Sequence, residues 1–254
     1  MKYLTKIKYV GDGFYGFQVQ NGKRTVQGTL TEAFSSLFGC ETKITGCSRT
    51  DSGVHALCFC ATVEPTSDNA PHIAPNKLPQ AVFPYLPSDL SVYDAIEVPS
   101  HFHPRYSVKS KEYLYRIYNA KIPDPFLNNR VWNTGIILND SAICRMNEAA
   151  KYIIGKHDFT SFMAKGSKIC DCVRTVLSLT VEKTGCEIII RISADGFLYN
   201  MVRIIVGTLF AVGRGRFSPE YVREIIEKKD RSLAGDTVPA CGLYLSFVTY
   251  DGIV

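Results

Sequence analysis

The stretch TKITGCSRTDSGVHALCFCATV, residues 42–63, places two apolar runs on either side of a short polar connection. The first run, Thr42 to Cys47, is rich in β-branched residues, and the second extends from Val54 to Val63. Gly53 supplies the permissive backbone that a tight connection between strands needs. The spacing therefore predicts a strand, a turn and a second strand, with Asp51 at the tip of the turn.

Asp51 has the sequence neighbours of a reactive carboxylate. Arg49 is two residues away, and a guanidinium within a few ångströms lowers the pKa of a carboxyl group by roughly 1–3 units. An ionised carboxylate on a rigid turn of small residues is how a nucleophilic Asp would be presented to a substrate. The same residues also fit an Asp that caps its own turn beside a solvated Arg. On this stretch alone, both interpretations stand.

Composition is that of a globular protein with a mildly basic surface. The 254 residues carry a formal net charge of +5, with 46% hydrophobic and 21% charged residues. The N-terminus lacks the apolar core of a signal peptide, and no apolar run is long enough for a membrane span. We therefore expect a soluble protein that stays in the cytoplasm.

Short basic groups alternate with the 14 Tyr and 14 Phe residues. Basic residues beside aromatic ones suit a phosphate-rich partner with unstacked bases, as in RNA. The group formed by Arg105, Lys109 and Lys111 precedes a predicted strand, and these are our candidate RNA-binding residues.

Neither a metal nor a cofactor is expected. The nine cysteines never form the C-x-x-C pairs of a zinc site, so we interpret them as reduced, buried thiols. His101 and His103 have no second ligand pair. The segment GDGFYG, residues 11–16, formally matches G-x-G-x-x-G, but the next helix begins only at Thr25, so we predict a loop and no dinucleotide site.

Periodicity predicts the same order of elements twice. In the first half it indicates strands at 3–10, 42–47, 54–63 and 90–98, and helices at 25–39 and 75–83. In the second half it indicates strands at 111–119, 173–182, 186–193 and 242–250, and helices starting at Asp140 and covering 197–212, with an additional one at 219–229.

Both halves follow the ferredoxin-like β-α-β-β-α-β order. The expected fold is α+β, with two ferredoxin-like halves that join antiparallel sheets around a central RNA-binding cleft. We place the N-terminal half at 1–107 and the C-terminal half at 108–254.

Two further residues stand out in the second half. Arg203 is the only charge in FLYNMVRIIVGTLFAV, residues 197–212, so its guanidinium needs a carboxylate or phosphate partner. That partner is either a structural carboxylate on a neighbouring strand or Asp51 across the cleft. Tyr113 shares one face of a strand with Tyr115 and Ile117, where it either belongs to the core or stacks on a base.

In their order along the chain, several motifs together resemble the tRNA pseudouridine synthase A family. They are GDGFYGFQVQ, SRTDSGVHA, FHPRYSVKSKEYLYRIYN, HDFTSF, DGFLYNMVRIIVGTL and DRSLAG followed by GLYL. The resemblance implies isomerisation of uridine to pseudouridine at positions 38–40 of the tRNA anticodon arm, without cofactor or metal. It also implies a cytoplasmic homodimer whose two subunits both contact the tRNA.

The resemblance also implies roles for single residues. Asp51 matches the family's nucleophile, and Arg49 and Arg203 match the arginines that orient it and pair with it. Tyr113 matches the tyrosine that contacts the target base, and Leu243 matches an apolar residue of the pocket. Attack by Asp51 at C6 of the uracil and attack at C1′ of the ribose both remain open.

Two alternative functions stay open on the sequence. An N-glycosidase would use the same attack at C1′ but release the base, and it would need a second carboxylate or water-activating group beside Asp51. A non-catalytic tRNA-binding protein would account for the basic and aromatic residues and leave Asp51 as a turn residue.

Overall fold

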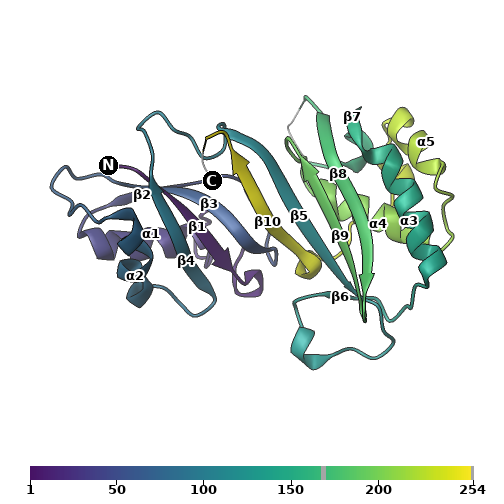
Figure 1. Cartoon of the computed structure of the whole chain (residues 1–254), viewed down its shortest axis with the longest axis horizontal. Helices are drawn as coiled ribbons and strands as arrows, with labels where there is room; N and C mark the ends of the chain where they lie inside the picture. Colours follow the sequence, from purple (N-terminus) through teal and green to yellow (C-terminus); the bar gives the residue numbers. More distant parts are fainter. Residues whose placement is uncertain (167–169, 253–254) are drawn as a thin grey trace. The chain divides into compact units, whose positions relative to one another are not determined.

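The computed structural model describes residues 1–166 and 170–252 (Figure 1). The chain forms two compact units. The first contains Met1–Lys109 and the segment from Tyr244 onward, and the second contains Ser110–Leu243. Within the described residues, none of the helices combines the length and hydropathy that a membrane span requires.

The sheet of the first unit has the strand order of a ferredoxin-like fold. Its strands are β1 (Tyr3–Tyr9), β2 (Thr42–Gly46), β3 (His55–Pro65) and β4 (Leu90–Glu97). They follow the order β4-β1-β3-β2, and every neighbouring pair is antiparallel. The last strand of the chain, β10 (Leu243–Tyr250), runs parallel to β3, pairing Tyr244 with His55 and Leu245 with Ala56. All four predicted strands of this half are confirmed.

Helix α1 (Val26–Phe38) forms where its end signals predict it. The Thr25 hydroxyl accepts a hydrogen bond from the Gly28 backbone N–H at 3.2 Å, and Gly39 ends the helix at φ +66°. Its buried face carries Phe34 and Phe38, and the Phe38 ring stacks on Tyr3 of β1. The shorter α2 (Leu78–Val82), between the 3₁₀ turns Pro75–Lys77 and Phe83–Tyr85, covers the predicted short helix.

The second unit is also built from a mostly antiparallel sheet and helices. Strands β5 (Val108–Tyr118), β9 (Glu187–Ala194), β8 (Val173–Thr184) and β7 (Gly155–Asp158) are neighbours in that order, all antiparallel. Figure 1 shows α3 (Asp140–Ile153), α4 (Met201–Gly213) and α5 (Tyr221–Lys228) gathered on one side of this sheet. The α+β class and the mostly antiparallel sheets are therefore confirmed.

Some element boundaries differ from the sequence prediction. Helix α4 begins at Met201 and not at Phe197, because Asn200 adopts the left-handed conformation with φ +59° and stops the helix from extending toward the N-terminus. Two short strands, β6 (Trp132–Asn133) and β7, were not predicted. They have two and four residues, too few for periodicity to reveal.

The cysteines agree only partly with the expectation of buried thiols. None of the nine forms a disulfide bond, and Cys47, Cys58, Cys60 and Cys172 are buried. Cys144, Cys170 and Cys186 are exposed, which corrects the prediction for these three. Cys170 and Cys186 lie in connections, and Cys144 lies within α3 on its exposed face.

Helix α4 is the packed centre of the second unit. Every residue of α4 except Arg203 is buried, as its uniformly apolar sequence predicts. The helix touches the segment 235–238 backbone to backbone: a Cβ on Gly207 would lie 1.9 Å from the carbonyl oxygen of Asp236. The hydroxyl of Thr208 accepts a hydrogen bond from the Gly235 N–H at 2.9 Å. No side chain fits between these segments.

We therefore expect Gly207→Ala to lower the free energy of unfolding by about 3 kcal/mol or more, since backbone cannot move aside as a flexible side chain can. Gly196→Ala is the matched control, because its new Cβ would meet only the movable side chain of Arg174 at 3.3 Å. Urea unfolding followed by circular dichroism measures both. Equal stability of the two variants would contradict the close contact.

Candidate active site

Asp51 lies in the connection between β2 and β3, as the sequence predicts. The Val54 N–H donates to the Asp51 carbonyl at 3.2 Å, and Gly53 adopts φ +80°. The side chain of Asp51 is half-buried. The turn thus fixes the backbone of Asp51 and leaves part of the residue open to solvent.

The loop Gly11–Phe17 holds this turn in place. The Phe17 N–H donates to the Thr50 carbonyl at 3.1 Å, directly before Asp51. A Cβ on Gly11 would lie 2.0 Å from the Val54 carbonyl oxygen, and one on Gly16 would lie 2.6 Å from the Thr50 carbonyl oxygen. Only glycine allows such an approach at these positions. Gly11 and Gly16 of GDGFYG therefore serve the turn that carries Asp51.

Sequence reasoning missed this role. It correctly gave a loop, since only a 3₁₀ turn, Gly11–Gly13, forms there. The sequence feature that could have revealed it is three glycines within six residues, with no helix starting among them. Such a pattern indicates that the backbone lies close to another segment. Periodicity within a segment does not reveal which distant segment that is.

Side chains reinforce the contact between loop and turn. The hydroxyls of Tyr9 and Thr50 are hydrogen-bonded at 2.8 Å, and the Ser52 hydroxyl donates to the Phe14 carbonyl at 3.2 Å. Thr50 is buried. The residues on either side of Asp51 in the sequence are therefore both anchored.

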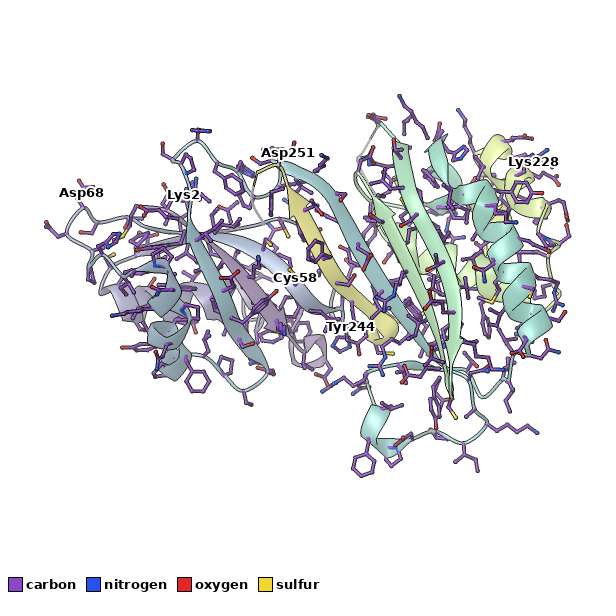
Figure 2. The ribbon with its side chains drawn as sticks, viewed as in Figure 1. Lys2, Cys58, Asp68, Lys228, Tyr244 and Asp251 are labelled. Carbon is purple, nitrogen blue, oxygen red and sulfur yellow. The ribbon has the colours of Figure 1, made fainter. Side chains whose placement is uncertain are left out.

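His55, just after the turn, links three segments. Its Nδ1 accepts a hydrogen bond from the Gly11 N–H at 2.9 Å, so the neutral ring carries its proton on Nε2. The ring stacks on Tyr244, with centroids 4.5 Å apart and an interplanar angle of 22°. Tyr244 lies at the start of β10 (Figure 2). His55 is only 1% exposed and belongs to the internal framework of the site.

Arg49 differs from the buried framework around it. Its side chain is exposed, and its pairing with Asp51 stays a prediction. The exposed guanidinium remains accessible to an anionic ligand.

Arg203, Tyr113 and Leu243 belong to the second unit. The Arg203 Nε donates to the Val238 carbonyl at 2.7 Å, and a terminal guanidinium nitrogen donates to Asn200 Oδ1 at 2.7 Å. The left-handed backbone of Asn200 thus both starts α4 and brings an acceptor to Arg203. These contacts fix the guanidinium on the first turn of the helix.

Tyr113 lies on β5, opposite Ile192 of β9, and is 7% exposed. The ring of Phe197 meets it edge-on, with centroids 5.0 Å apart. Tyr115, two residues along the same face, is fully buried and donates its hydroxyl to the Pro239 carbonyl at 2.7 Å. Burial raises the pKa of the Tyr115 phenol far above its usual value, so this phenol stays protonated. Leu243 is 6% exposed.

The candidate RNA-binding residues have different surroundings. Arg105 and Lys109 are exposed, and Lys111 is half-buried. The Lys109 ammonium lies 3.0 Å from the Asp251 carboxylate, but both side chains are more than half exposed, so solvent weakens this pair. Among the described residues no group of three His, Cys, Asp or Glu side chains is arranged to hold a metal ion.

The hydrogen bond from Gly11 to His55 gives a test of the framework. His55→Ala leaves the buried Gly11 N–H without an acceptor, which costs about 1–3 kcal/mol of unfolding free energy. His55→Asn also loses the stacking on Tyr244 but keeps an acceptor near the position of Nδ1, so we expect a smaller loss. Urea unfolding of the two variants checks this order, and equal losses would mean that the bond does not stabilise the fold.

Two sequence comparisons identify the family of this chain. The sequence model of a family described as tRNA pseudouridine synthase matches residues 6–107 and 149–251. A tRNA pseudouridine synthase A of Thermoanaerobacter sp. (strain X514) is 44% identical over 244 residues, covering 96% of this chain and 97% of that protein. The protein of the same name from Bacillus subtilis (strain 168) is 43% identical over 253 residues, covering 99% and 100%.

Solved structures add a weaker likeness. A chain of the crystal structure of a Cbf5-Nop10-Gar1 complex is 11% identical, with a TM-score of 0.35, covering 82% of this chain and 54% of that one. A similarity this low supports no conclusion by itself. The match to the family model and the full-length relatives decide the assignment: this chain belongs to the tRNA pseudouridine synthase family, enzymes that isomerise uridine to pseudouridine.

Proposed function

We propose that this enzyme isomerises uridine at positions 38–40 of the tRNA anticodon arm, with Asp51 as the nucleophile. The observation that carries the proposal is the anchored turn. A half-buried carboxylate stands on backbone that a second loop holds from Thr50 to Val54. A nucleophile held in this way keeps its orientation as the substrate enters.

The reaction balances without cofactor or metal. The Asp51 carboxylate attacks C6 of the uracil or C1′ of the ribose, and the glycosidic bond between N1 and C1′ breaks. The base rotates, C5 bonds to C1′, and the covalent bond to Asp51 is released. The proton on C5 leaves to a base and N1 gains a proton, so that product and substrate are isomers.

The target uridine must leave its stack, which costs a few kcal/mol. Tyr113 is our candidate for the side chain that contacts the extruded base, and Leu243 contributes an apolar wall. Tyr113 is held edge-on by Phe197, so its ring plane is fixed before substrate binds. Tyr113 is also a candidate for the base that removes the C5 proton.

Arg49 and Arg203 are proposed to orient Asp51 and pair with it. For Arg203, two hydrogen bonds support this assignment. They join its guanidinium to the Val238 carbonyl and to Asn200 Oδ1, and so limit where the guanidinium can point. Arg105, Lys109 and Lys111 are proposed to contact phosphates. The proposal also includes a homodimer, which the resemblance to the family supports, and functional halves at 1–107 and 108–254, which the repeated order of elements supports. Cytoplasmic location completes it.

Asp51→Asn should reduce turnover by roughly 10⁴-fold or more, since the amide is a poor nucleophile. Affinity for tRNA should stay within about threefold of wild type, because phosphate contacts dominate it. The measurement is tritium release from a tRNA transcript labelled at C5 of uridine, in EDTA, with binding by gel shift. Asp68→Asn, in an exposed loop of the same unit (Figure 2), is the matched control and should behave as wild type.

The same assay separates the alternatives. Release of free uracil would support an N-glycosidase. Recovery of unmodified tRNA from several substrates with uridine in the anticodon arm would support a binding protein. Tritium release by Asp51→Asn at the wild-type rate would remove Asp51 from the mechanism.

Arg203→Ala should lower both turnover and stability. The variant loses two charge-assisted hydrogen bonds and leaves the Val238 carbonyl without the donor it has in the wild type. The free energy of unfolding should therefore fall by about 2 kcal/mol or more. Arg145→Ala is the control, since Arg145 also donates to a backbone carbonyl, that of Gly213. The control should lose stability but keep its turnover per folded molecule. If both variants lose stability alone, Arg203 is purely structural.

A further inference from the structure

The second unit contains a cavity that the proposed chemistry does not use. Its volume is about 440 Å³, and it lies between the C-terminal turn of α4, the segment 214–221 and the segment 232–239. This volume falls within the range of about 300–1,000 Å³ that is typical of small-ligand sites. None of Tyr113, Arg203 and Leu243 is among its lining residues.

Two aromatic pairs line the cavity. Trp132 and Phe210 have ring centroids 4.7 Å apart, and Phe217 and Tyr221 have centroids 5.0 Å apart. Trp132, Phe217 and Tyr221 are only partly covered. Partly exposed rings that hold one another in position suit a planar ligand that stacks.

The charge beside these rings is positive. Arg214 and Arg216 both line the cavity and are exposed, and within the described residues neither guanidinium forms an ion pair. The guanidinium of Arg216 lies 5.9 Å from the centroid of the Phe217 ring. A flexible pair of cations at the rim of an aromatic cavity suits a phosphate attached to a stacking group. Asp236 is the one carboxylate among the lining residues.

The cavity is preformed. Its wall includes Gly207 and Gly235. At these two glycines the backbones of two segments touch and leave no room for a Cβ. A rigid site does not have to be ordered when its ligand binds, which favours affinity.

The cavity shares a wall with the Arg203 framework. Val238 and Pro239 line it, while their carbonyl groups accept hydrogen bonds from Arg203 and Tyr115. One short segment therefore lies against the cavity and also holds a side chain assigned to the reaction.

We propose that this cavity binds a second, unstacked nucleotide of the RNA substrate, with its base among the aromatic rings and its phosphate on Arg214 and Arg216. The proposal rests on the proposed function, since it takes the substrate to be an RNA. It assigns the cavity to substrate affinity and selection, and not to the chemical step.

Trp132 provides a direct readout, because it is the only tryptophan in the chain. Wild-type protein is titrated with a tRNA transcript whose uridines at 38–40 are replaced by cytidine, so that no turnover occurs. We expect Trp132 fluorescence to be quenched with the same affinity that a gel shift reports. Unchanged fluorescence at saturating RNA would overturn the proposal.

The variant pair R214A/R216A tests the cations. We expect it to weaken tRNA binding about tenfold and to reduce the slope of log K against log salt by about 1.4–1.8 for two lost phosphate contacts. At saturating tRNA its turnover should match wild type. The control K151A/K156A removes two exposed lysines of the same unit and should bind tRNA as wild type does. Equal binding by the two double variants would overturn the proposal.

Two further measurements identify what binds in the cavity. If adenosine monophosphate quenches Trp132 as well as RNA does at equal nucleotide concentration, the ligand is a free nucleotide and the proposal fails. If R214A/R216A changes the sedimentation coefficient of the protein without RNA, this face is a protein interface and the proposal fails.

Tritium release by wild type separates this inference from the proposed function. Release together with normal binding by R214A/R216A would contradict the cavity assignment alone. Absence of release together with arginine-dependent quenching by RNA would contradict the isomerisation and leave the cavity assignment standing.

Discussion

The presentation of Asp51 depends on backbone contact between two loops that are about forty residues apart in the sequence. The Gly11–Phe17 loop reaches the Thr50–Val54 turn through the hydrogen bond from Phe17 to Thr50 and through glycines that leave no space for a Cβ. Backbone atoms cannot adopt another rotamer as side chains can, so this contact has little freedom to relax. His55 extends it to β10 by binding the Gly11 N–H and stacking on Tyr244.

The repeated β-α-β-β-α-β order explains why the candidate residues are divided between two units. In each unit a sheet buries one face against helices, and this core fixes the ends of the strands. Asp51 follows the second strand of the first repeat, whereas Tyr113 lies on the first strand of the second repeat. The repeated strands and helices thus form the rigid scaffold, and the residues proposed to react lie on its loops and strand faces.

The sequence predicts those features that depend on neighbouring residues. The Thr25 cap, the Gly39 stop and the turn at Gly53 all appear where their local chemistry requires them. The start of α4 could not be predicted, because periodicity does not show that Asn200 adopts a left-handed conformation. The role of GDGFYG and the pair Gly207–Gly235 also escaped prediction, since each depends on which distant segment comes close.

The two units hold their key residues by the same physical means. In the first unit, glycines at 11 and 16 bring backbone against the Asp51 turn, and in the second, glycines at 207 and 235 bring α4 against the segment that binds Arg203. Substitution at either contact forces backbone to move, so variation that preserves activity is confined to the exposed side chains around these contacts. Arg214 and Arg216 are such side chains, exposed and directly after the end of α4. Differences in RNA preference within this fold should therefore arise at these arginines and not at the glycine contacts.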